Sequence, residues 1–229
     1  AEDWDLLIPE VIERSYPLND DSGRRMAVKI VGCDSGGREG VSVNARTFWR
    51  SLRDDPLGRA HHRRFHLIVG RTTGTMPRET IWPDSGQKGF KGALRNDVPV
   101  ERLQSNVLKD RLNVVLSRED EGGTRFRWAL WTPAFFYTQM CAEERLEGKG
   151  WVSGKGRQRN ESWDLSYYAI GICLHPNINL DAIRWDEPDR VPAWARPWGE
   201  NPLVFSPEAD VGEQLVETEG TATKKLAQI

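Results

Sequence analysis

The sequence lacks the features of a secreted or membrane protein. It has no run of about 18 apolar residues, which a transmembrane helix requires, and its start, Ala1 to Trp4, lacks the basic and apolar regions of a signal peptide. Its three cysteines, Cys33, Cys141 and Cys173, are far apart, lie in apolar stretches and have no zinc-ligand spacing. We therefore expect buried, unpaired thiols in a reducing compartment, the cytosol.

Two kinds of catalytic motif are also missing. No Gly-x-x-x-x-Gly-Lys-Ser/Thr element occurs, so this chain contains no P-loop ATPase. Ser35 and Ser85 have no histidine and acid in a suitable sequence context, which disfavours nucleophilic hydrolysis. The formal net charge of −2 hides arginine clusters at 59–71 and 157–159 and an excess of acids after Glu200. A local basic face is enough to hold phosphates, so the overall charge does not argue against a nucleic-acid partner.

The order of apolar patterns predicts an α/β fold with a mixed sheet, because strands and helices alternate along the chain. The 229 residues suit one main domain over 1–205, followed at 206–229 by an acidic tail without aromatics that we expect to be flexible. Periodicity predicts helices at 3–15, 44–53, 106–116, 135–146 and 161–174, strands at 26–33, 65–70, 98–103 and 125–131, loops at 71–97 and 148–159, and irregular packing at 176–202.

One acidic residue ends the first strongly apolar run. Asp34 follows Met26 to Cys33, and Ser35-Gly36-Gly37 comes directly after it. This pattern places a carboxylate at the carboxyl edge of a strand, with small residues behind it that let a metal or phosphate approach. The alternative is that Asp34 merely ends the strand or caps the next helix.

Two further acids lie at a predicted helix start. Glu161 and Asp164 are three residues apart, share a helix face and are preceded by Arg157 and Arg159. Carboxylates that hold two Mg²⁺ or Mn²⁺ ions beside phosphate-binding cations are what two-metal phosphodiester hydrolysis requires. In the alternative interpretation, Asn160 is the N-cap and Glu161 only complements the helix dipole.

These elements together resemble the nuclease part of lambda-type phage large terminase subunits, in the family order over residues 26–175. Of the matching elements, the most specific is Arg-Asn-Glu-x-x-Asp. The matches are Gly32-Cys33-Asp34-Ser35-Gly36-Gly37, Phe48-Trp49-Arg50, Asn106-Val107-Leu108-Lys109-Asp110, Phe136-Tyr137, Ala142-Glu143-Glu144 and Arg159-Asn160-Glu161-Ser162-Trp163-Asp164.

The resemblance implies an RNase H-like endonuclease that uses Mg²⁺ or Mn²⁺ to cut concatemeric double-stranded phage DNA during packaging, in the host cell cytoplasm. It implies the small terminase subunit and the capsid portal as partners. Asp34 matches the family's strand-end acid and Glu161 its helix-start acid, with Asp164 as a third ligand. Lys109 matches a family lysine, for which we weigh phosphate contact against a solvated helix lysine. Arg157 and Arg159 are the expected phosphate contacts.

Two departures from the family qualify this expectation. The packaging ATPase is absent from this chain, and the family nuclease opens with an earlier strand that bears an aspartate. If that strand precedes Ala1, the chain is a fragment without one metal ligand, and it is expected to cut DNA poorly or not at all. A non-catalytic DNA-binding module that docks on capsid or portal through its acidic tail, or a resolvase-like or integrase-like nuclease, are the alternatives.

Other basic residues are weaker candidates. His61, His62 and His66 lie in an arginine-rich stretch without an acidic or cysteine partner at metal spacing, so we favour a basic exposed surface over a metal site. In the loop that follows, Lys88 and Lys91 are expected to contact DNA by charge.

Overall fold

The computed structural model describes residues 2–37, 40–83, 97–118, 126, 128–154 and 159–207. The expected DNA contacts Lys88, Lys91 and Arg157, and residues 208–229 of the predicted tail, lie outside these ranges. The chain divides into two compact units, one of Ala1–Val31 with Ile183–Ile229 and one of Gly32–Ala182. A single domain over 1–205 stays a prediction. In the described part of the chain, no helix is long and apolar enough to cross a membrane.

The first unit is built around a small antiparallel sheet. Its strands, in the order β1 (Ser15–Pro17), β2 (Arg25–Ala27) and β9 (Val204–Phe205), pair through Tyr16 with Met26 and Met26 with Val204. The predicted helix at 3–15 is wrong in its last turn, because α1 (Glu2–Asp5) and a π-helix (Ile8–Ile12) end before Ser15 enters the sheet. Short 3-10 helices at Pro188–Arg190 and Ala193–Ala195 agree with the irregular packing expected there.

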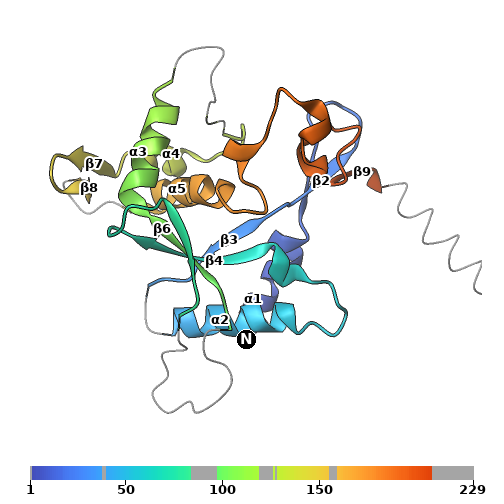
Figure 1. Cartoon of the computed structure of the whole chain (residues 1–229), viewed down its shortest axis with the longest axis horizontal. Helices are drawn as coiled ribbons and strands as arrows, with labels where there is room; N and C mark the ends of the chain where they lie inside the picture. The colour runs from blue at the N-terminus through green and yellow to red at the C-terminus, as the bar shows by residue number, and fades with distance from the viewer. Residues whose placement is uncertain are drawn as a thin grey trace, which may run out of the picture. The chain divides into compact units, whose positions relative to one another are not determined.

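The second unit contains a four-stranded mixed sheet, which confirms the α/β class (Figure 1). Strands β4 and β6 are parallel, with Leu67 opposite Val100, and β5 is antiparallel to β6. The RNase H-like topology stays a prediction. In sheet order, the strands are β3 (Val31–Asp34), β4 (Phe65–Arg71), β6 (Val100–Gln104) and β5 (Arg78–Ile81).

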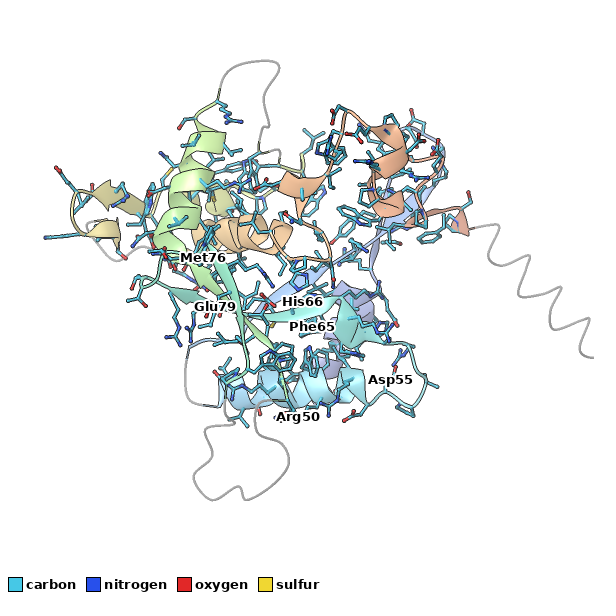
Figure 2. All side chains as sticks on the ribbon, viewed as in Figure 1. Arg50, Asp55, Phe65, His66, Met76 and Glu79 are labelled. Carbon is cyan, nitrogen blue, oxygen red and sulfur yellow. The ribbon has the colours of Figure 1, made fainter. Side chains whose placement is uncertain are left out.

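Helices cover both faces of this sheet. Successive side chains of a strand point to opposite faces, so neighbouring residues of β4 contact different helices. Phe65 of β4 meets Phe48 of α2 (Val41–Arg53) with ring centroids 5.3 Å apart. The next residue, His66, points the other way, and its ring lies 4.1 Å from that of His175, which follows α5 (Glu161–Cys173). Figure 2 labels Phe65 and His66 side by side on β4. The sheet is therefore the middle layer between α2 and α5.

The α5 side of the sheet carries the remaining elements. Helix α3 (Ser105–Leu116) starts directly after β6 and packs on α5 (Figure 1). Helix α4 (Ala134–Met140) also packs on α5, and it is followed by a hairpin of β7 (Glu143–Leu146) and β8 (Gly150–Ser153).

Several predicted elements need correction. The apolar run 26–33 is two strands, because β2 pairs within the first unit and β3 with β4. The helix predicted at 135–146 ends at Met140, and β7 begins at Glu143. The predicted loop at 71–97 contains β5, which pairs with β6, and the predicted loop at 148–159 contains β8, which pairs with β7 in a hairpin. The described residues of 125–131 are not in a strand.

The burial of individual side chains also differs from the periodic pattern. On α5, Leu165 is 55% exposed, whereas Trp163 and Tyr167, with 3% and 2% exposure, form the buried face. The three cysteines are unpaired, as expected, but the predicted burial is not found: Cys33 and Cys173 are half-buried and Cys141 is exposed. On α2, Phe48, Trp49 and Leu52 are buried.

Candidate functional site

The strand-end aspartate lies at the edge of the second unit's sheet. Asp34 is the last residue of β3, its side chain is exposed, and its Oδ1 accepts the Gly36 N–H at 2.9 Å. The next residue, Ser35, is buried and donates its hydroxyl to the Ile68 carbonyl of β4 at 2.9 Å. The strand end is thus anchored to the sheet while its carboxylate faces outward.

A buried lysine joins two carboxylates close to the start of α5. Lys109 of α3 is only 6% exposed. Its Nζ lies 2.8 Å from Glu143 Oε2 and 2.7 Å from Asp164 Oδ1. The same ammonium lies 4.9 Å from the ring centre of Tyr167. Lys109 is therefore not a solvated lysine, and its charge is already engaged by two acids, so the structure gives no support to a direct phosphate contact.

The residue before α5 completes this cluster. The Asn160 side chain makes no helix-capping bond. Its amide instead donates to Glu143 Oε1 at 2.6 Å and to Asp164 Oδ2 at 3.1 Å. Asn160 is thus the N-cap residue of α5 by position, since its backbone carbonyl accepts the Asp164 N–H at 2.9 Å, but its side chain holds the two carboxylates and does not cap the helix. We call Lys109, Glu143, Asn160 and Asp164 the lysine–carboxylate cluster.

Asp164 is the member of this cluster that still reaches solvent, since 31% of its side chain is exposed. Burial raises its pKa, the Lys109 charge opposes that rise, and the negative charges of Glu143 and Glu161 add to it. Asp164 is thus held between a partner that favours its charged form and acids that disfavour it, a balance that a bound cation would shift toward ionisation.

The hydroxyl of Tyr167, a residue of α5, lies beside the ends of two sheet strands. The Tyr167 hydroxyl lies 3.1 Å from Ser105 Oγ, beside Gly70, whose missing side chain leaves room for it. Burial raises the pKa of Tyr167 to about 12, and the charges of Asp164 and Asp34 both contribute. Tyr167 follows Asp164 by three residues on α5, and its hydroxyl lies at the edge of the sheet where β4 and β6 end.

The β7–β8 hairpin positions Glu143, a residue to which we assigned no role from the sequence. Its strand β8 docks on α3: the Trp151 N–H donates to Asn106 Oδ1 at 3.0 Å, and Trp151 Nε1 donates to Asp110 Oδ1 at 2.7 Å. Gly150 allows this approach, because a Cβ there would lie 2.5 Å from Asn106 Oδ1. The Ala-Glu-Glu match was the only sequence signal for Glu143.

We expect Gly150→Ala to destabilise the protein by about 1–3 kcal/mol, because it combines overpacking against Asn106 with a left-handed backbone (φ 82°). Denaturant unfolding followed by circular dichroism measures the change. Gly148→Ala is the matched control, since Gly148 is also left-handed (φ 71°) but has nothing within 4 Å of an added Cβ. Equal losses for the two variants would show that the Asn106 contact is unimportant.

The other predicted site residues lie at the surface of the same region. Glu161, the first residue of α5, is exposed, and its Oε1 lies 3.9 Å from the Arg159 guanidinium. Arg159 is itself 79% exposed. Both exposed side chains can turn toward a ligand. The position of Glu161 is compatible with metal binding and also with the alternative that it only complements the helix dipole.

The acid groups fit the expected Mg²⁺ or Mn²⁺ in donor type, because both are hard ions that prefer carboxylate oxygens. Asp34, Glu161 and Asp164 offer such oxygens, and the buried charge of Lys109 compensates the negative charge of Asp164 and Glu143. Asp34, Glu161 and Asp164 do not all lie within 4.8 Å of one another in the described chain. A pair of metal ions about 4 Å apart does not require all three acids to lie so close together, because some acids bind one ion and some bind the other.

A second group of potential ligands lies elsewhere in the unit. Among the described residues, only His66, Glu101 and His175 bring three potential ligand atoms within 4.8 Å of one another. Burial lowers the pKa values of His66 and His175 to about 4, helped by the positive charge of Arg78. The exposed basic surface predicted for His61, His62 and His66 is wrong, because none of the three is exposed.

Comparison with known proteins identifies the family. The family described as "Terminase large subunit gpA, endonuclease domain" matches residues 1–185. No curated protein matches the chain, and no solved structure does either. The family match covers most of the chain, including the whole region that carries the predicted resemblance and all the acids described above. The chain therefore belongs to the family of terminase large subunit gpA endonuclease domains.

Proposed function

We propose that this chain is the metal-dependent endonuclease domain of a phage DNA-packaging terminase, with an RNase H-like fold, and that it cuts concatemeric double-stranded DNA. The observation that carries the proposal is the family match over residues 1–185, within which Asp34 ends a strand of the sheet and Asp164 is paired with the buried Lys109. Concentrated acid at an accessible sheet edge is what divalent metal ions need to hold a phosphodiester.

In this proposal, Asp34, Asp164 and Glu161 hold Mg²⁺ or Mn²⁺. Bound metal supplies an activated water and neutralises charge on the leaving oxygen. Lys109 and Asn160 do not touch DNA; they fix the Asp164 and Glu143 carboxylates by the short contacts described above. Arg159 contacts the phosphate backbone, and the same role is proposed for Arg157, Lys88 and Lys91, which lie outside the described residues. The small terminase subunit and the capsid portal are the proposed partners in the host cytoplasm.

The experiment that tests this function compares DNA cleavage with and without divalent metal. The protein, expressed from its complete reading frame, is expected to nick supercoiled plasmid in Mn²⁺ or Mg²⁺ and to stop when a chelator removes the ion. Mn²⁺ is also expected to raise the thermal unfolding temperature, because binding to the folded state alone stabilises it. Cleavage that continues in excess chelator would contradict the proposal.

The same measurements separate the two alternatives. A DNA-binding or capsid-docking module would bind DNA but show neither cleavage nor a metal-dependent thermal shift. A resolvase-like or integrase-like nuclease would instead show junction-specific cutting or strand transfer. We favour the packaging nuclease because the family match covers residues 1–185.

A further inference from the structure

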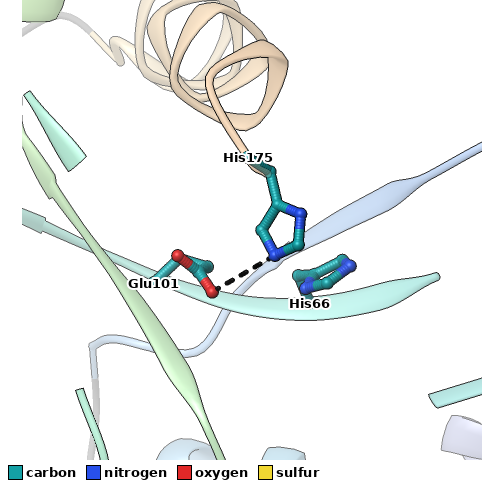
Figure 3. A group of neighbouring side chains, drawn as sticks. All are labelled: His66, Glu101 and His175. Atoms are coloured by element: carbon teal, nitrogen blue, oxygen red, sulfur yellow. Dashed lines mark ion pairs between the residues drawn. The ribbon is translucent and has the colours of Figure 1, made fainter. Parts of the chain in front are cut away.

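Figure 3 shows His66 of β4, Glu101 of β6 and His175, which follows α5, as one group of neighbouring side chains. Asp164 lies in the first turn of α5, whereas His175 follows the last residue of that helix, Cys173. The stretch from Asp164 to Cys173 spans about 14 Å of helix. Glu101 and His175 are only 2% and 8% exposed, so a DNA phosphate cannot reach them. We call these three residues the His–Glu–His group.

One nitrogen of this group is buried without a hydrogen-bond partner. His66 makes a ring hydrogen bond to the Arg63 backbone, while its Nε2 is buried and has no partner among the described residues. The bond to Arg63 is therefore made by Nδ1, which donates its proton and leaves a lone pair on Nε2. A buried lone pair without a partner is unfavourable, and in native proteins such an atom calls for an explanation.

The other two residues direct ligand atoms to the same place. His175 Nε2 lies 3.7 Å from Glu101 Oε1 (Figure 3). Arg78 binds the second oxygen of Glu101, Oε2, at 2.7 Å, and the Thr80 hydroxyl lies 3.1 Å from Oε2 and 3.2 Å from Oε1. These contacts hold the carboxylate in place, as the outer partners of metal-binding carboxylates do, with Oε1 on the side of His175.

We propose that His66, Glu101 and His175 bind one transition-metal ion, with Zn²⁺ as the fitting ion, and that this ion joins β4, β6 and the end of α5. Two imidazole nitrogens and one carboxylate oxygen are a known zinc ligand set, completed by water, whereas Mg²⁺ and Ca²⁺ prefer oxygen alone. This ion is distinct from the metal proposed for DNA cleavage, because Glu101 and His175 are buried and the site is closed to DNA.

Two contacts in the His–Glu–His group make metal binding less favourable. The Arg78 guanidinium carries a positive charge near the site, but it lies on the oxygen of Glu101 that the metal does not use. Asn177 N–H donates to His175 Nδ1 at 3.2 Å. Metal binding at Nε2 moves the His175 proton to Nδ1 and gives up this long bond. The change of tautomer is a signature that a purely structural hydrogen-bond network would not show.

The test measures zinc bound by the full chain after chelator treatment and dialysis against micromolar Zn²⁺. We expect one zinc per chain and a thermal unfolding temperature that rises with Zn²⁺ but not with Mg²⁺. His66→Gln and His175→Gln are expected to lose both effects. Two controls are expected to keep them: His62→Gln, a histidine outside the group, and Asp34→Asn, which alters only the proposed nuclease site.

Two outcomes would overturn the proposal: an unsubstituted chain that retains no zinc, or histidine variants that retain a full equivalent. A histidine variant that fails to fold does not remove the test, because ¹⁵N NMR of the unsubstituted chain reads the same site. Stoichiometric Zn²⁺ should shift the ring nitrogens of His66 and His175 and convert His175 to the Nδ1–H tautomer, while those of His62 stay unchanged. Unshifted His66 and His175 nitrogens would contradict the site directly. Loss of DNA cleavage without loss of zinc would count against the proposed function alone.

Discussion

Asp34→Asn is expected to lower the rate of DNA cleavage about a thousand-fold, because charge stabilisation by a correctly held metal contributes several kcal/mol to the transition state. The fold should survive, since the Asp34 side chain is exposed and asparagine keeps the oxygen that accepts the Gly36 N–H. We expect the free energy of unfolding to change by less than about 0.5 kcal/mol. Plasmid nicking in Mn²⁺ and denaturant unfolding measure the two effects.

The matched control for Asp34→Asn is Asp54→Asn, an exposed acid at the end of α2 that pairs with Arg53. It removes the same charge from the same unit without touching the sheet edge, so cleavage should be unchanged. Glu161→Gln is expected to behave like Asp34→Asn if its carboxylate holds metal, and like Asp54→Asn if it only complements the helix dipole. Undiminished nicking by the Asp34 variant would remove the proposed site.

Lys109→Met is expected to destabilise the protein by about 3–5 kcal/mol, the range for breaking a buried ion pair from one side. Methionine preserves most of the volume, so the loss comes from two acids left without their cation: Glu143, whose side chain is 7% exposed, and Asp164. Denaturant unfolding at neutral pH measures the change. Lys149→Met, which replaces an exposed lysine in the same hairpin region, should stay within about 0.5 kcal/mol.

The pH dependence of the stability lost in Lys109→Met follows from the ionisation of Asp164. Its pKa is already raised by burial, and removing Lys109 takes away the charge that opposes the rise. A carboxyl with a raised folded-state pKa favours the fold at low pH and loses that contribution as the pH rises through the folded-state pKa. The deficit of Lys109→Met relative to the unsubstituted protein should therefore be smallest in acid and grow toward neutral pH. A deficit independent of pH would mean that lost packing, and not unpaired charge, is the cause.

Local patterns predicted the elements that are stabilised by their own periodicity. The helices at 44–53, 106–116 and 161–174 and the strands at 65–70 and 98–103 are confirmed within a few residues at each end. The wrongly predicted elements are those whose backbone hydrogen-bond partners lie far away in the sequence or on the other strand of a hairpin. Residues 143–146 continue the apparent helix of 135–146, but pairing with Gly150–Ser153 makes them a strand. Such pairing is a tertiary effect that overrides local propensity.

The candidate sites also divide into residues that local sequence patterns predicted and residues that only the tertiary structure brings together. Asp34, Glu161 and Asp164 could be predicted as candidate metal ligands from the sequence, because a strand-end acid and two acids in a helix's first turn are local patterns, and this role stays a prediction. For Lys109 we weighed phosphate contact against a solvated helix lysine, and neither predicted the buried ion pairs with Glu143 and Asp164. Glu143 had no assigned role. The His–Glu–His group was missed, because its members are separated by 35 and 74 positions in the chain.

The sequence by itself determined the fold class, the order of its main helices and strands, and the family, since these depend on apolar periodicity and on short motifs carried by neighbouring residues. Only the tertiary structure decided which charges are buried together. Lys109 meets Glu143 and Asp164 because α3, the β7–β8 hairpin and α5 pack at one edge of the sheet. The ionisation and ligand capacity of a side chain depend on the groups within a few ångströms of it, and packing alone places those groups.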